Sequence, residues 1–383
     1  MSAQSRPKAD REALRPHISE WFGHRVFPTV AAHEIAQTDQ AAERCPFRTR
    51  VAEKEMDCVK PVNSRGVCTI SAGSNGSRQD WLVCPHRALD DDLLYPMVRQ
   101  LFDLPSASGL HVIPVTNLAI PSRLRELQST LLDEKSPPQF LTFQQHFGGE
   151  ISLPRSPANP ELSFDLTVVE VLPPDNHDDP GFRLGRYGVI EIQTTDTHGT
   201  YRHAVNALKN ARDLHQVDFA QQVAAHPDWP GRKVEGPNIS NVFKRTFYQL
   251  MFKFQITRRS SSMGCILAIP LPVWDSWQPF LGAPELQEMP DGTHRLLAGK
   301  GGINIDPDPN SRNWIFVFDI ADQPPVDGSP TAIDIRMRVA TDTPTLSRLA
   351  LDVAPSRAVG NGSKHDTVLA ALKRRVAQFT TTE

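Results

Sequence analysis

Residues 164–172 read FDLTVVEVL and residues 187–194 read YGVIEIQT, and these two stretches decide the fold. Both are short and rich in β-branched residues, which favours buried strands over helices. Residues two apart in a strand project to the same face, so Glu191 and Gln193 point together while Ile190 and Ile192 point to the opposite face. A polar pair on so apolar a strand is unfavourable unless its charge and hydrogen bonds are satisfied. The second strand is therefore the first place to look for a functional site.

Helix and strand patterns alternate on both sides of these stretches. Spacing of apolar residues and capping signals predict helices at 12–22, 122–131, 139–147, 201–223, 241–259 and 365–379. Further apolar runs predict strands at 264–272, 314–320 and 333–339. Such alternation predicts an α/β fold whose core is a mixed central sheet flanked by helices.

Composition excludes several classes of protein. The 383 residues carry 41 basic and 44 acidic side chains, a net charge of −3, so the chain is neither a polycation nor an acidic tail. The longest apolar stretch, 265–274, is much shorter than the roughly 20 residues of a membrane helix. The polar N-terminus lacks the apolar segment of a signal peptide, so a cytoplasmic location with reduced cysteines is expected. The length suggests two domains, at 1–115 and 116–383.

Two carboxylates mark the site on the predicted strands. If the strands pair as neighbours, Asp165 lies beside Glu191. Two carboxylates a few ångströms apart repel each other and favour a bound divalent cation, and Mg²⁺ is a natural occupant because it prefers hard oxygen ligands. The competing interpretation is an ordinary solvated strand face, on which acidic and polar residues also alternate.

Four of the five cysteines lie within forty residues, in a loop-rich region with few apolar periodic runs. They are Cys45, Cys58, Cys68 and Cys84. Four thiolates in a tetrahedron suit zinc or iron, so a structural metal site is favoured, although the spacing is wider than in a zinc ribbon. His86 could replace one ligand. Unrelated buried thiols and disulfides are the other interpretations, and Cys265 in a predicted strand is expected to be a core thiol.

Basic residues cluster near the carboxylate pair in sequence, which the nearly neutral total conceals. These candidates for contacts with DNA phosphates are Arg183, Arg186, Arg202, Lys244, Arg245, Arg258 and Arg259. The alternative is that they are the exposed faces of ordinary amphipathic helices.

The order of these features resembles the PD-(D/E)XK nuclease superfamily. Its members carry an acidic residue on one strand, Glu/Asp-x-Lys on the following strand, and then a helix. Here Asp165 takes the first position, Glu191 the second, and Gln193 stands where the family has lysine. The resemblance implies that Asp165 and Glu191 hold Mg²⁺ against the scissile phosphate and that Gln193 orients the attacking water. Glu150, placed after the predicted 139–147 helix, matches the auxiliary acidic residue of many members.

The glutamine removes a positive charge that would stabilise an attacking hydroxide, so the metal must do more of that work. Together with the four N-terminal cysteines, the motif resembles type II restriction endonucleases of this superfamily. That resemblance implies a bacterial homodimer that cuts double-stranded DNA at the palindrome GCGGCCGC, iron at the four cysteines, and a cognate methyltransferase that acts on the same site without a stable complex. The alternatives are a non-catalytic DNA-binding protein with a structural four-cysteine site, and a metallohydrolase acting on a small phosphodiester.

Overall fold

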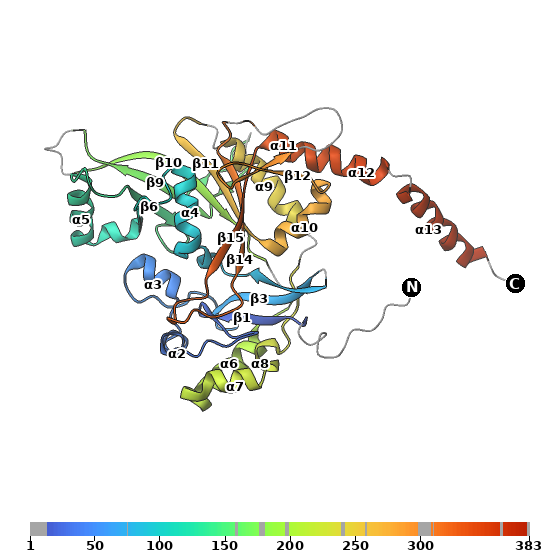
Figure 1. Cartoon of the computed structure of the whole chain (residues 1–383), viewed down its shortest axis with the longest axis horizontal. Coiled ribbons are helices and arrows are strands. Elements are labelled where there is room, and N and C mark those ends of the chain that lie inside the picture. The colour runs from blue at the N-terminus through green and yellow to red at the C-terminus, as the bar shows by residue number, and fades with distance from the viewer. Residues whose placement is uncertain are drawn as a thin grey trace.

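The computed structural model describes residues 14–74, 76–157, 160–175, 181–195, 199–238, 242–256, 259–297, 308, 310–360 and 363–380. A large mixed sheet forms the centre of the molecule, and a small antiparallel sheet lies beside it (Figure 1). Within the described residues the large sheet has nine strands: β5 (His111–Pro114), β6 (Gln139–Gln144), β9 (Leu166–Leu172), β10 (Arg183–Ile192), β11 (Ser262–Pro270), β12 (Glu285–Glu288), β13 (His294–Leu297), β14 (Asn313–Ile320) and β15 (Ile333–Thr341). The predicted α/β class with a mixed central sheet is confirmed.

The large sheet contains both parallel and antiparallel pairs of strands. Its order is β12-β13-β15-β14-β11-β10-β9-β6-β5. At its centre, β9 runs antiparallel to β10, and β10 and β14 run parallel to β11 on either side. The strands predicted at 164–172, 187–194, 264–272, 314–320 and 333–339 are all present, with ends shifted by a few residues. Because the middle strands are buried on both faces, their apolar runs were readable from the sequence.

Helices cover both faces of the central strands (Figure 1). Every residue of β11 is buried, and alternate residues belong to different core clusters. Leu267 packs on the side of α9 (Val242–Ile256) and α10 (Leu271–Leu281), whereas Ile266 packs on the side of α4 (Asp91–Phe102). The face toward α9 is the one that carries the candidate site.

The small sheet has the order β2-β1-β3-β4 and packs against three helices below it in Figure 1. Its strands are β1 (His17–Trp21), β2 (His24–Arg25), β3 (Val67–Ser74) and β4 (Ser77–Leu82), and the helices are α6 (Arg202–His215), α7 (Phe219–Ala225) and α8 (Asp228–Gly231). Two fully buried arginines connect this part of the chain to the large sheet. Arg25 in β2 donates to the carbonyl of Ile320, the last residue of β14, at 2.9 Å. Arg87, in the segment after β4, donates to the carbonyl of Thr331, just before β15. The division at residue 115 stays a prediction, but β5 from the first part is a strand of the large sheet and α4 packs against that sheet.

The remaining helices are short or peripheral. They are α2 (Glu34–Ala41), α3 (Pro46–Ala52), η1 (Pro85–Leu89), η2 (Val115–Ala119), α5 (Pro121–Leu131), η3 (Gln216–Asp218), α11 (Thr343–Arg348), η4 (Leu349–Val353), α12 (Ala354–Gly360) and α13 (Ser363–Thr380). Helices predicted at 122–131, 241–259 and 365–379 correspond to α5, α9 and α13. The last extends away from the body (Figure 1) and exposes its apolar side chains, including Phe379. Among the described helices, none is both long and apolar enough to cross a membrane.

Three predicted helices are corrected by the structure. Of the segment 12–22, the described residues 17–21 form β1, because pairing with β2 and β3 buries them on both faces. The segment 139–147 begins as strand β6, with Phe140 packed on the side of α4 and Leu141 on the opposite side. The segment 201–223 is not one helix, because Gln216 adopts a positive φ of 40° and separates α6 from η3 and α7.

Candidate functional site

The two predicted carboxylates come together at the edge shared by β9 and β10. The antiparallel register pairs Ile190 with Leu166, and one further step places Glu191 opposite Asp165, which directly precedes β9. Asp165 Oδ2 accepts a hydrogen bond from the Ile192 amide at 2.9 Å, which fixes the carboxylate beside the strand. The expectation that the two strands are neighbours is therefore confirmed.

Glu191 is a buried carboxylate with an incomplete set of partners. Its residue is 7% exposed, because the alternation of β10 turns it toward α9 and into the core. Its Oε2 accepts from Lys253 Nζ, whereas its Oε1 is buried and has no hydrogen-bond partner among the described residues. Burial, and second the negative charge of Asp165, raise the pKa of Glu191 to about 8, although Lys253 opposes both effects. An unpartnered buried oxygen beside a second carboxylate is a good place for a cation.

Gln193 lies just beyond β10 and continues its pairing with β11, since its amide donates to the Ala268 carbonyl at 2.9 Å. Its side chain is held from two sides: Thr246 Oγ1 donates to its Oε1, and its Nε2 donates to the Thr194 carbonyl at 2.5 Å. These contacts fix the glutamine against α9, so its position is set by the helix as well as by the strand.

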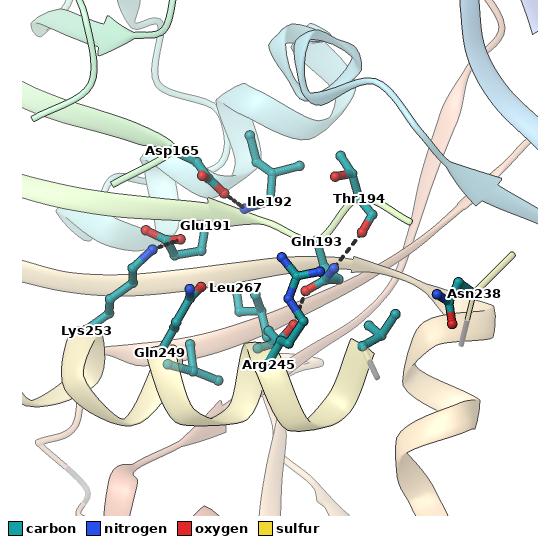
Figure 2. Close-up of a pocket in the computed structure, with 13 residues that line it drawn as sticks. Asp165, Glu191, Ile192, Gln193, Thr194, Asn238, Arg245, Gln249, Lys253 and Leu267 are labelled. Atoms are coloured by element: carbon teal, nitrogen blue, oxygen red, sulfur yellow. Dashed lines mark hydrogen bonds and ion pairs between the residues drawn. The ribbon is translucent and has the colours of Figure 1, made fainter. Parts of the chain in front are cut away.

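A cavity of about 330 Å³ opens above the carboxylate pair, between the sheet and α9 (Figure 2). Asp165 and Glu191 line it from the sheet. Several polar side chains line it from α9 and the segment before it: Asn238, Arg245, Thr246, Gln249 and Lys253. The cavity therefore has negative charge on one wall and neutral or positive polar groups on the other, which suits a cation and a phosphate bound together.

Thr246 and Gln249 were not predicted for the site, and Lys253 was noted only as one of the basic residues of the segment 241–260. They recur at i, i+3 and i+7 along α9, which places them on one side of the helix. The spacing of apolar residues predicted the helix, but it did not indicate that the polar side of α9 faces the two carboxylates. Lys253 is 62 residues from Glu191 in sequence, and only the packing of α9 on β10 and β11 brings the two together.

Glu150 lies close to the pair without lining the cavity. It follows a turn after β6 rather than the predicted helix, and two glycines with positive φ, Gly148 and Gly149, shape that turn. Partial burial, and second the negative charge of Asp165, raise the pKa of Glu150. Glu150 thus lies at an exposed position within electrostatic reach of Asp165, and its auxiliary role stays a prediction.

The predicted basic residues are dispersed over the surface. Arg245 lines the cavity, and Lys244 is exposed beside it on α9. Arg183 and Arg186 lie at the other end of β10 from Glu191, where they pair with Asp175 at 3.2 Å and with Glu170 at 3.6 Å. The others are also separate: Arg202 begins α6, Arg259 lines a second cavity, and Arg258 lies outside the described residues.

The four N-terminal cysteines converge on one small cavity of about 10 Å³, roughly the room for one water-sized sphere. The cavity is lined by Cys45, which precedes α3, Cys58 in the following loop, Cys68 in β3, Cys84, which precedes η1, and by Lys60 and His86. All are free thiols, and Cys265 lies apart from them in the core as expected. Among the described residues, no group of three or more histidine, cysteine, aspartate or glutamate side chains is arranged so that it could hold a metal ion.

The thiols influence one another strongly. A hydrogen bond with Cys68 lowers the pKa of Cys84 to about 6, despite burial, and the same bond raises the pKa of Cys68. Burial raises the pKa of Cys45 to about 12. The four thiols are therefore close enough to share hydrogen bonds and to influence one another's charge.

The cysteine cluster touches both loops that frame the carboxylates. On one side, the Leu82 carbonyl accepts from the Thr195 amide at 2.7 Å, two residues after Gln193. On the other side, the His86 ring lies 5.8 Å from the ring of His146, in the turn after β6 that leads to Glu150. The cluster is thus a support for the ends of β6 and β10.

The chain matches no known protein-family model, and no curated protein is significantly similar to it.

Proposed function

We propose that this protein is a Mg²⁺-dependent type II restriction endonuclease with a PD-(D/E)XK catalytic core. The observation that carries the proposal is the pair of carboxylates, Asp165 and Glu191, opposed on neighbouring strands and open to a cavity of about 330 Å³. The order of elements around the pair agrees with that superfamily: two antiparallel strands, then helices, then the parallel strand β11.

The residues present fit a hard divalent cation. Glu191 Oε1 is buried without a partner, and the second carboxylate, Asp165, raises the cost of leaving the pair without a cation. Asp165 and Glu191 would hold the ion, with phosphate and water completing its shell. When bound, Mg²⁺ would polarise the scissile phosphate and lower the pKa of an attacking water.

The chain's own residues position the reactants. The water oxygen bonds to phosphorus, one phosphorus–oxygen ester bond breaks, the leaving oxygen takes up a proton, and the proton lost by water passes to solvent. Gln193, anchored by Thr246 and the Thr194 carbonyl, would orient the water. Glu150, on the loop after β6, adds negative charge at the rim, where it would help to retain the cation.

The four cysteines would hold iron, or zinc, in a structural role. Four thiols around a cavity of about one ion's size are a suitable donor set, and tetrahedral coordination by four thiolates leaves no open position for water or phosphate. A bound ion would draw the four ligands together and fix the Leu82 carbonyl, which anchors the backbone after Gln193. Its contribution to activity would therefore be through folding and positioning.

Double-stranded DNA is the proposed substrate. The chain resembles the restriction endonuclease NotI in length, in the four N-terminal cysteines and in the Asp165…Glu191-x-Gln193 pattern. The specificity proposed from this resemblance is GCGGCCGC. A palindrome calls for a homodimer in which each subunit cuts one strand, and a cognate methyltransferase would protect the same site without a stable complex.

A second candidate is a non-catalytic DNA-binding protein, and the neutral Gln193 in the position of the family's lysine favours it. Incubation of plasmid DNA containing GCGGCCGC with the protein and Mg²⁺, against an EDTA control, separates the candidates. Discrete fragments with Mg²⁺ alone support the endonuclease. DNA that is shifted but intact supports the second candidate, and DNA neither cut nor shifted contradicts both.

A further inference from the structure

The positive charge that Gln193 lacks is present in the site, on a different element. Of the described residues that line the cavity, Arg245 and Lys253 carry a positive charge, and Lys253 forms an ion pair with Glu191. Figure 2 shows its side chain reaching from α9 to Glu191, while Gln193 lies farther along the strand. The ammonium of Lys253 thus contacts Glu191 directly, whereas the side chain of Gln193 is bonded to Thr246 and to the Thr194 carbonyl.

Packing holds Lys253 in this place. Its side chain is 6% exposed, and its Nζ lies 6.0 Å from the centre of the Phe164 ring, directly before Asp165 in the chain. Two helical turns earlier, Thr246 donates to Gln193. Contacts at both ends of this seven-residue interval align α9 with the strand end, so Lys253 has little freedom to leave the site.

We propose that Lys253 is the catalytic lysine of this nuclease, supplied by α9 instead of by the strand, and that Gln193 with Thr246 positions the helix that carries it. The inference rests on the proposed endonuclease function. In the reaction, the ammonium would stabilise negative charge on the attacking water oxygen and on the phosphate as the phosphorus–oxygen bond forms. The effect is purely electrostatic: Lys253 forms no covalent bond and keeps its proton.

A simpler role would be to neutralise Glu191 in the core and nothing more. The two roles differ in what a lysine at another place can restore. A lysine placed at position 193 could supply charge to the phosphate, but it would not re-form the packed contact between α9 and Glu191. Rescue of cleavage by such a relocated lysine therefore identifies a charge that acts on the reaction rather than on the fold.

The experiment compares wild type with Lys253→Met, Lys253→Arg, Gln193→Lys and the double variant Gln193→Lys/Lys253→Met. The exposed Lys135→Met, far from the cavity in the turn after α5, is the matched control. Three quantities are measured: single-turnover cleavage of a duplex containing GCGGCCGC with Mg²⁺, affinity for the same duplex in EDTA, and Mg²⁺ affinity of the DNA-free protein by titration calorimetry.

Lys253→Met should slow cleavage by about 100-fold or more, which is typical for loss of one preorganised charge. Its affinity for DNA should stay within about threefold of wild type, and Mg²⁺ should bind no more weakly, since a cation beside the metal has been removed. Lys253→Arg should retain part of the rate, and the double variant should regain at least about tenfold over Lys253→Met.

Two outcomes overturn the inference while leaving the endonuclease function standing. One is Lys253→Met cleaving within about threefold of wild type. The other is a double variant no faster than a folded Lys253→Met, together with loss of Mg²⁺ binding in both, which assigns Lys253 to the support of Glu191 alone. If Lys253→Met does not fold, a folded Lys253→Arg that lacks all cleavage but binds Mg²⁺ and DNA normally also contradicts it. A wild-type protein that cuts no DNA refutes the proposed function itself.

Discussion

Glu191 should make the protein less stable as the pH rises, when no Mg²⁺ is added. Burial and the charge of Asp165 raise its pKa from an ordinary 4.5 to about 8 in the folded chain. Between these values the folded protein keeps a proton on Glu191 that the unfolded chain has released. The contribution of Glu191 to stability is therefore fully present below pH 4.5 and is lost as the pH rises toward 8.

The size of the effect follows from the interval between the two pKa values. From pH 5 to pH 7.5 the loss is about 2.5 pH units at about 1.4 kcal/mol each, or roughly 3 kcal/mol in the free energy of unfolding. Glu191→Gln keeps the shape of the protonated acid, and its carbonyl oxygen can still accept from Lys253, but it does not titrate. The variant should match wild type within about 1 kcal/mol at pH 5 and exceed it by roughly 3 kcal/mol at pH 7.5.

Urea unfolding followed by tryptophan fluorescence at several pH values, without added divalent cation, measures this difference. Glu170→Gln on neighbouring β9 is the control, because that carboxylate is more exposed and pairs with Arg186 at the surface. Saturating Mg²⁺ at pH 7.5 should stabilise wild type and leave Glu191→Gln nearly unchanged. A Glu191→Gln protein less stable than wild type at pH 7.5 would refute the reasoning, since it would mean that the ion pair with Lys253 outweighs burial.

Three further sets of substitutions test the proposed roles of Asp165, Gln193 and the cysteines. Asp165→Ala should lower the cleavage rate about 100-fold or more while gel-shift affinity for DNA persists, and wild-type rates in this variant would place the metal elsewhere. Gln193→Ala should slow cleavage without changing the sequence that is cut, as mapped by end-labelled products; an unaffected rate removes Gln193 from the mechanism. Cys84→Ser should lose a tightly held iron or zinc and several kcal/mol of stability, measured by elemental analysis and urea unfolding, whereas Cys265→Ser should keep the metal. A metal-free wild type that folds and cuts normally would show that the four cysteines are ordinary buried thiols and not metal ligands.

The central strands could be predicted because their environment is simple. The second half of β10 and the whole of β11 are buried on both faces, and their apolar, β-branched runs therefore indicate strands. The pairing of Asp165 with Glu191 could then be predicted, because it required only that the two strands be neighbours. The segment 139–147 failed for the opposite reason: QFLTFQQHF is a short apolar run in which periodicity does not separate helix from strand, and pairing with β5 and β9 decided it.

Spacing along the chain could predict that the cysteines lie together, but it could not predict the contact of Lys253 with Glu191. Grouping of the four cysteines within forty residues predicted a common site, and their side chains do line one cavity. Lys253 was visible as one basic residue on an amphipathic helix, but its partner lies 62 residues away, on a strand of the large sheet. No local pattern encodes which side of α9 packs over the carboxylates, because that depends on how the whole helix fits against β11.

Cleavage of a defined duplex tests the central claim most directly. A duplex of about 30 base pairs with one GCGGCCGC site, and a second with one base pair of that site changed, are incubated with wild type or with Asp165→Asn, in Mg²⁺ or in EDTA. Two discrete fragments are expected only from wild type, only in Mg²⁺ and only on the intact site. Uncut duplex with wild type in Mg²⁺, or equal cutting by Asp165→Asn, would contradict it.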